Sequence, residues 1–226
     1  MMARDVTALD IAFPSRSSSS FGGKKPVASV SLVLEGGDER QIVLPVRVAR
    51  SLEGEGAIAL PCELERAFEL IHQREAELCF ETLVEMLSRR EHSVAEARRK
   101  LLDYGYRSEE VEGALQKALS SRFLDDERFT RAFIAERKRR GWGRRKIELE
   151  LSHRGIDIEA SRALSEEPFE EEDELGRARA VLARRPLPEG DAYGRLVRRL
   201  MGKGFSYSVA SQAARDRIAL ADAPDA

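Results

Sequence analysis

The sequence predicts a mainly α-helical protein: three tandem three-helix (helix-turn-helix-like) repeats in an elongated array, preceded by a small N-terminal subdomain rich in β-hairpin. Helical periodicity of the apolar residues begins at about Leu64 and continues towards the C-terminus. Within this part Gly105, Gly155 and Gly204 recur at intervals of 50 and 49 residues, which indicates a repeat. Upstream of Leu64 apolar residues alternate with others instead, which is typical of β-strands.

The first two segments differ in their apolar content. Residues 1–26 carry a run of serines and little apolar surface, which predicts a disordered tail. Apolar residues then alternate from Val30 to Leu34 and resume at Ile42 after two glycines, a pattern that predicts a β-hairpin. We expect this leader subdomain over residues 27–62. A sheet of two or three strands is marginally stable alone, so it should pack against the helices that follow.

The helical part divides where its periodicity is interrupted. We expect the first repeat with its lead-in helix, the second repeat, the third repeat and a C-terminal tail at residues 63–121, 122–166, 167–220 and 221–226. The first helices of the three repeats are expected over residues 75–90, 126–140 and 171–184. The breaks Gly141-Trp142-Gly143 and Pro186-Leu187-Pro188 then end the first helices of the second and third repeats.

Each repeat carries the signature of a helix that ends in a tight turn and is followed by another helix. Four residues before the three glycines stand Leu101, Leu151 and Leu200, and directly after the glycines stand Tyr106, Ile156 and Phe205. In a Schellman cap these flanking residues are in contact and the glycine has a positive φ. The helices that follow are expected to be capped by Ser108, Asp157 and Ser206. Ser93 opens a capping box with Glu96.

The composition narrows the class of protein. The chain has 226 residues with 38 basic and 40 acidic side chains, a net charge of −2, and only 6% aromatic residues. A balance so near neutrality is not that of a strongly basic nucleic-acid-binding domain. Cys62 and Cys79 are too few for a disulfide scaffold, and no apolar run approaches the roughly 20 residues of a membrane helix. We therefore expect a cytoplasmic protein with reduced thiols and no membrane contact.

No motif for catalysis or for cofactor binding emerges. Asp125 and Asp126 could hold a metal or act as an acid pair, but no third ligand is nearby, and two carboxylates at a helix start are typical of a cap. His92 precedes the cap residue Ser93, so we expect it in a turn. The sequence has no phosphate-binding loop of the kind found in nucleotide hydrolases. We expect no enzyme activity, no cofactor and no metal.

Several ordered motifs between Glu81 and Arg217 resemble the RecX family of recombinase regulators. They are Arg89-Arg90-Glu91-His92-Ser93 with Arg99-Lys100-Leu101 and Gly105, Leu124-Asp125-Asp126-Glu127-Arg128-Phe129, Gly141-Trp142-Gly143-Arg144-Arg145-Lys146-Ile147 with Leu151 and Gly155, and Lys203-Gly204-Phe205-Ser206. The resemblance implies a non-catalytic protein that binds the RecA recombinase filament. It also implies inhibition of the ATPase, strand-exchange and coprotease activities of RecA in DNA repair, homologous recombination and the SOS response. Compact members of the family begin near the first repeat, so the resemblance assigns no role to the leader.

Two dense charge runs are the candidates for contact with a partner. Seven cations lie between positions 137 and 146, across a helix end and a new helix start, where the helix dipole opposes them. An equally dense acidic block lies at residues 166–174. Both runs could be solvated helix ends, and pairing between them would make the basic run structural. The candidate partner-binding residues are Arg89, Arg90, Arg137, Lys138, Arg139, Arg140, Arg144, Arg145 and Lys146.

Other motif residues are expected to build the repeats. Trp142 should either plug the core, which we favour, or stand exposed as an anchor for a partner. The expected structural residues are Ser93, Leu101, Gly105, Asp125, Asp126, Phe129, Gly141, Trp142, Gly143, Leu151, Gly155, Leu200, Gly204 and Phe205. We expect a monomer, and the family resemblance implies that its partner is another protein.

The alternative function is a DNA-binding module of the helix-turn-helix type. Acidic residues, among them Glu109 and Asp157, stand in the first turns of two candidate recognition helices, where they would repel phosphate. The corresponding helix of the third repeat carries Gln212 and Arg215, which leaves a weak DNA contact open there.

Overall fold

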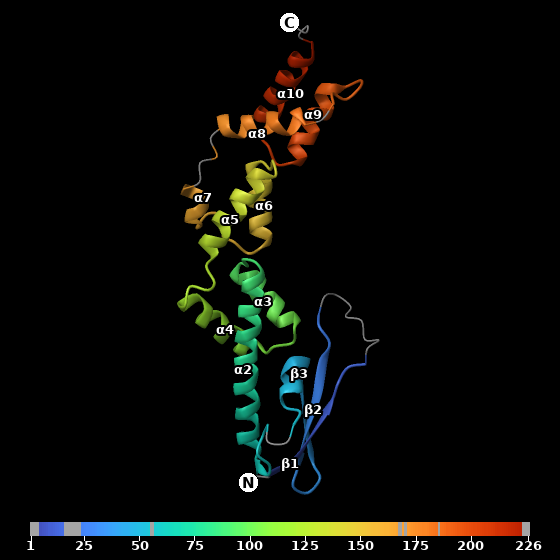
Figure 1. The fold of residues 1–226 in the computed structure, drawn as a ribbon, viewed down its shortest axis with the longest axis vertical. Helices are drawn as coiled ribbons and strands as arrows, with labels where there is room; N and C mark the ends of the chain where they lie inside the picture. Colours follow the sequence, from blue (N-terminus) through green and yellow to red (C-terminus); the bar gives the residue numbers. More distant parts are fainter. Residues whose placement is uncertain are drawn as a thin grey trace. The chain divides into compact units, whose positions relative to one another are not determined.

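The computed structural model is mostly helical, with a small antiparallel sheet near the N-terminus, which confirms the predicted fold class (Figure 1). The structure describes residues 5–15, 24–54, 57–166, 169, 171–184 and 186–222. The chain forms two compact units, residues 1–125 and 126–226. Among the helices described, none is both long and apolar enough to cross a membrane.

The N-terminal sheet has four antiparallel strands in the order β3-β2-β1-β4. The strands are β1 (Asp5–Ala12), β2 (Val27–Leu34), β3 (Glu39–Pro45) and β4 (Cys62–Glu63). β2 and β3 form the predicted hairpin, with Val33 opposite Glu39 next to the turn. Gly36 and Gly37 in that turn both have a positive φ, which glycine adopts without strain.

The prediction of a disordered tail over residues 1–26 is wrong for residues 5–12, which form β1. β1 pairs with β2 along most of its length, and its first residues pair with β4. This pairing places Val6 in the core, where it is fully buried. A strand can therefore form with only a few apolar side chains when these lie on the one face that the core covers. The tail residues 1–4 and 16–23 lie outside the described part of the chain.

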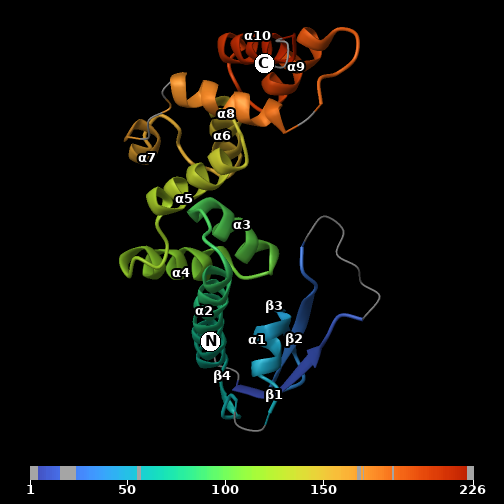
Figure 2. The same cartoon turned by 45° about the horizontal axis from the view of Figure 1, so that its top comes forward.

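The sheet packs on the first three-helix repeat. The helices of this unit are α1 (Val46–Ser51), α2 (Leu64–Arg89), α3 (Val94–Asp103) and α4 (Ser108–Ser120). The short helix α1, which the sequence pattern did not predict, lies between the sheet and α2 (Figure 2). Val30 and Leu32 of the sheet share one apolar core with Leu83 and Leu101 of the helices. The leader therefore packs on the repeat, and α2 replaces the expected lead-in helix and first helix with one continuous helix.

The second unit holds the other two repeats. Its helices are α5 (Asp126–Arg139), α6 (Arg144–His153), α7 (Arg162–Glu166), α8 (Glu171–Ala183), α9 (Ala192–Gly202) and α10 (Tyr207–Asp222). Each repeat has its own apolar core: Phe129 and Leu151 belong to that of the second repeat, and Leu200 and Phe205 to that of the third. α10 continues to Asp222, so residues 221 and 222 belong to a helix and not to the predicted tail.

The three predicted helix ends are confirmed. Gly105, Gly155 and Gly204 have φ angles of 89°, 79° and 91° and follow α3, α6 and α9. In the second repeat the Ile156 N–H donates to the Leu151 carbonyl at 3.1 Å, and the Gly155 N–H donates to the carbonyl three residues back at 2.9 Å. The first and third repeats form the same pair of bonds. These are the two hydrogen bonds of a Schellman cap.

The predicted helix starts are correct in two cases and wrong in two. Ser93 and Ser206 each accept a hydrogen bond from the N–H three residues later, at 3.1 and 3.2 Å. Ser108 is the first residue of α4 and not its cap, because the helix is preceded by Arg107, whose N–H is bound by a carboxylate of α2. Asp157 caps only a turn, since α7 begins five residues later.

Candidate functional site

The candidate site is the basic junction between α5 and α6. We use this name for Arg137, Lys138, Arg139, Arg140, Arg144, Arg145 and Lys146. At its centre Trp142 is half-buried and packs against the core of the second repeat. The Arg137 guanidinium lies 4.9 Å from the centroid of the Trp142 ring, and Lys146 Nζ lies 4.4 Å from it. Trp142 therefore packs on the core, which is the role that we favoured, and its ring also contacts two cations of the junction.

Phe169 organises two more cations in the same way. Its ring centroid lies 4.3 Å from Lys138 Nζ and 5.3 Å from Arg144 Cζ. A cation over an aromatic ring gains roughly 0.5–1 kcal/mol at an exposed site. Sequence reasoning missed Phe169, although a lone aromatic residue inside the acidic block was a signal that could have found it. The two rings keep four cations of the junction close together.

Acidic residues of the same helices neutralise part of the junction. Arg140 forms an ion pair with Glu136 one turn earlier in α5, and Arg144 forms one with Glu148 one turn later in α6. Pairs at this spacing share one helix face and stabilise an isolated helix by a few tenths of a kcal/mol. The charges of Arg140 and Arg144 are thus balanced within the repeat.

Arg139 and Arg145 differ from the other cations of the junction. Both side chains are exposed, and neither forms an ion pair with any residue that the structure describes. The Arg145 backbone is fixed, because its N–H donates to the Gly204 carbonyl at 3.2 Å. The junction therefore presents two exposed guanidinium groups without an ion pair to a described residue, while the neighbouring cations contact acidic or aromatic side chains.

The start of α6 is joined to the third repeat by main-chain hydrogen bonds. Beside the Arg145 bond, the Gly143 N–H donates to the Lys203 carbonyl at 2.9 Å. A Cβ atom at Gly143 would lie 2.4 Å from the Gly204 backbone, and one at Gly204 would lie 2.4 Å from Lys146. The α9–α10 turn therefore reaches α6 only because both positions are glycine. We call this contact the glycine joint.

A buried carboxylate completes the start of α6. Glu174 of α8 is 7% exposed, and its Oε1 accepts a hydrogen bond of 2.8 Å from the Arg144 N–H. A negative charge at the N-terminus of a helix interacts favourably with the helix dipole, and here it also offsets the cations in the first turn of α6. Its ion-pair partner is Arg177, at 3.5 Å. Glu174 thus contacts the basic run through the Arg144 backbone N–H, whereas its ion pair is with Arg177, outside the run.

The rest of the acidic block is engaged elsewhere or not described. Glu166 pairs with Arg162 at 3.1 Å and with Arg131 at 3.6 Å. Residues 167 and 170 lie outside the described part of the chain, as do the side chains at positions 171 and 172.

Replacement of Glu174 by alanine should lower the free energy of unfolding by about 1.5 kcal/mol, because the Arg144 N–H and the Arg177 guanidinium both lose a buried acceptor. Chemical denaturation of the whole chain measures this change. Asp173→Ala is the matched control, since its side chain is exposed beside Glu174, and it should change the stability by less than about 0.5 kcal/mol. Equal effects of the two substitutions would refute the capping role.

The two remaining candidate cations, Arg89 and Arg90, belong to the first unit. Arg90 Nη1 lies 3.0 Å from the carboxylate of the buried Glu96, which gives it a structural role. Arg89 is exposed and forms no ion pair with a described residue. His92, which was expected in a turn, precedes α3 but is only 2% exposed, with Nδ1 3.5 Å from the Glu96 carboxylate. Burial, assisted by the positive charges of Arg90 and Lys100, lowers the pKa of His92 to about 4.

The other motif residues lie where helices start, end or pack. Leu101, Leu151 and Leu200 are fully buried, and Asp126 is the first residue of α5. In the described part of the chain, no group of three or more histidine, cysteine, aspartate or glutamate side chains is placed to hold a metal ion. The arrangement around the basic junction is suited to binding an acidic surface.

Comparisons with known proteins agree with this architecture. The family model described as "RecX, second three-helix domain" matches residues 125–163, which cover α5, α6 and the start of α7. Regulatory protein RecX of Vibrio vulnificus (strain CMCP6) is 34% identical over 134 residues, which are 57% of this chain and 86% of that protein. Regulatory protein RecX of Herbaspirillum seropedicae is 36% identical over 124 residues, 54% of this chain and 79% of that protein.

Two solved structures share the fold. The crystal structure of RecX from Lactobacillus salivarius has a TM-score of 0.55 at 16% identity and covers 64% of this chain and 97% of its own. A crystal structure of regulatory protein RecX has a TM-score of 0.56 at 18% identity and covers 94% of this chain and 99% of its own. The fold and the basic junction thus define a helical repeat protein made of three-helix units. The chain belongs to the RecX family of regulatory proteins.

Proposed function

We propose that the protein binds the RecA recombinase filament through the basic junction and inhibits the ATPase, strand-exchange and coprotease activities of the filament. The observation that carries the proposal is that the guanidinium groups of Arg139 and Arg145 are exposed and form no ion pair with any residue that the structure describes. Exposed charges without an ion-pair partner are available to an acidic surface of a partner, where they add specificity and speed of association.

In this proposal the protein acts as a monomer in the cytoplasm, within DNA repair, homologous recombination and the SOS response. It acts by occupying the filament and has no catalytic step of its own. The names of its relatives, which describe regulatory proteins, support this direction. The purified protein should therefore reduce DNA-dependent ATP hydrolysis by RecA and hydrolyse no nucleotide when RecA is absent.

A DNA-binding module of the helix-turn-helix type is less well supported. The first turn of α4 carries Glu109 and Glu110, and the turn before α7 carries Glu159. These carboxylates would face the phosphates of a groove-bound duplex, which costs affinity. On α10, Gln212 donates to Asp216 at 2.8 Å, so its amide is already engaged within the helix.

Charge reversal at the two unpaired arginines tests the proposal. Arg139→Glu combined with Arg145→Glu should raise the concentration that half-inhibits RecA ATPase and strand exchange at least tenfold, about 1.4 kcal/mol of binding. The melting temperature should change little, because neither side chain contributes an ion pair to the fold.

Arg40→Glu combined with Arg50→Glu is the matched control. Both arginines are exposed in the first unit, outside the junction, and form no ion pair with described residues. This control should inhibit RecA as the unmodified protein does. Full inhibition by a folded Arg139→Glu, Arg145→Glu protein would reject the basic junction as the working surface. Failure of the unmodified protein to alter RecA activity would reject the proposed function itself.

A further inference from the structure

The first unit contains a cleft of about 410 Å³ between the β-rich leader and the helical repeat. Its walls come from four places in the chain: the segment before β2, the connection from β3 to α1, the second half of α2 and the turn between α3 and α4. The volume is within the range of ligand sites in proteins. The proposed function above makes no use of this cleft.

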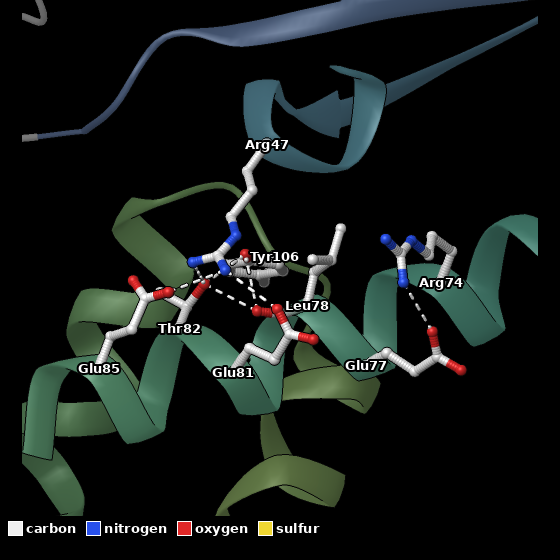
Figure 3. Close-up of polar contacts among 8 residues, drawn as sticks. All are labelled: Arg47, Arg74, Glu77, Leu78, Glu81, Thr82, Glu85 and Tyr106. Carbon is white, nitrogen blue, oxygen red and sulfur yellow. Dashed lines mark hydrogen bonds and ion pairs between the residues drawn. The ribbon is translucent and has the colours of Figure 1, made fainter. Parts of the chain in front are cut away.

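A polar network centred on Arg47 includes Thr82, Glu85 and Tyr106 of the cleft lining. Figure 3 shows the Arg47 side chain reaching from α1 towards Glu81 and Glu85 of α2. Arg47 Nη2 lies 3.0 Å from Glu81 Oε2 and 2.8 Å from Glu85 Oε1. Arg47 also donates to Thr82 Oγ1 at 3.2 Å, and this hydroxyl lies 2.8 Å from the phenol oxygen of the buried Tyr106. The hydrogen bond from Arg47, together with the positive charge of Arg89, lowers the pKa of Glu85 below its ordinary value.

The rim of the cleft carries positive charge at Lys25 and Arg89, and the Arg89 charge also acts on Glu85, one turn earlier in α2. Lys25 and Arg89 line the cleft, are exposed, and form no ion pair with a described residue. The Lys25 backbone is anchored, because its N–H donates to the Asp103 carbonyl at 2.7 Å. Lys25 Nζ lies 5.8 Å from the centroid of the Tyr104 ring, near the outer limit of a cation–π contact, so its three N–H donors remain available.

Apolar surface lies in the same cleft. Pro26 follows Lys25 directly, and Pro45 ends β3, so the lining combines two proline rings and the Tyr104 ring with the two cations. Proline and aromatic rings supply contact area at little cost in conformational entropy. The cleft therefore offers a ligand two cationic groups and an apolar surface.

We infer that the cleft binds a short acidic segment of a partner protein, with carboxylates on Lys25 and Arg89 and an apolar side chain against Pro26 and Pro45. Charge-assisted hydrogen bonds from lysine and arginine to carboxylates are the recognised basis of such docking. A nucleic acid fits less well, because its charge repeats at every nucleotide and would meet the Glu85 carboxylate in the cleft lining. A peptide can place its charges where the cations are.

The test uses the whole chain, no recombinase, and fluorescein-labelled decapeptides that each carry two glutamates separated by one to four residues around a leucine. Fluorescence anisotropy at low and at physiological ionic strength should show saturable, salt-dependent binding of at least one spacing. Matched peptides with glutamine in place of glutamate should not bind. Lys25→Glu combined with Arg89→Glu should weaken the best peptide at least tenfold, whereas Arg40→Glu combined with Arg50→Glu should leave its affinity unchanged.

Reversing the charges of both the protein and the peptide shows whether the variant is still folded. The Lys25→Glu, Arg89→Glu protein should bind the matched peptide that carries lysine in place of glutamate, which a misfolded protein cannot do. Absence of binding at every glutamate spacing would overturn the inference. Tighter binding of a labelled oligothymidine of equal charge, lost in the same variant, would overturn it in favour of a nucleic-acid site. Because no recombinase is present, these outcomes are independent of the proposed function.

Discussion

Gly204→Val should lower the free energy of unfolding by about 3 kcal/mol or more. Two costs combine at this position. The φ of Gly204 is 91°, where a β-branched residue is strained, and its new Cβ would lie 2.4 Å from the backbone nitrogen and Cβ of Lys146. The backbone of α6 cannot give way there without losing the glycine joint. Chemical denaturation of the whole chain, with the slope of the transition recorded, measures the loss.

A glycine two residues away is the matched control. Gly202 is the last residue of α9, its φ is in the ordinary range, and a Cβ built on it meets nothing within 4 Å. Gly202→Ala should keep or raise the stability, by up to about 0.5 kcal/mol, because it reduces the freedom of the unfolded chain. If Gly204→Val were no worse than Gly202→Ala, the close approach of the two repeats would be disproved.

Acidification from pH 7.5 to pH 5 should lower the free energy of unfolding by about 2 kcal/mol through His92 alone. Burial lowers its pKa to about 4 in the folded protein, against an ordinary value of 6.5. Between these two values the unfolded chain binds the proton more readily than the folded one. The contribution of His92 is therefore complete above about pH 6.5 and is lost as the pH falls towards 4.

The difference between variants isolates this effect from the carboxylates, which titrate in the same range. His92→Gln should flatten the dependence of stability on pH between 7.5 and 5. His153→Gln, which replaces an exposed histidine at the end of α6, should keep the dependence of the unmodified chain. A pH dependence that is identical in all three proteins would mean that His92 does not titrate with folding.

The sequence predicted the helix ends correctly because their signals are local. A Schellman cap needs a glycine and two apolar residues within six positions, and all three repeats carry them. β1 was missed because its stability comes from β2, which lies beyond the segment 13–26 and cannot be paired by local pattern alone. α1 was missed because its six residues are too few to show a helical period.

For the candidate site, the position of the cations could be predicted and their partners only in part. The pairs of Arg140 with Glu136 and of Arg144 with Glu148 follow the spacing of four on one helix, so the sequence contained that information. Glu174 stands 30 residues from the Arg144 N–H that it binds. A contact of that separation depends on how two repeats pack, which no local pattern describes.

Because the glycine joint is made of main-chain groups, it is indifferent to the side chains around it. Lys203 contributes its carbonyl, which any residue can supply, and Arg145 contributes its N–H, which any residue other than proline can supply. Only Gly143 and Gly204 are restricted in residue type. During evolution the exposed cations can be substituted as the surface of a partner changes. The main-chain contact between the two repeats is not affected by these substitutions. Recognition and assembly of the repeats are thereby free to diverge at different rates.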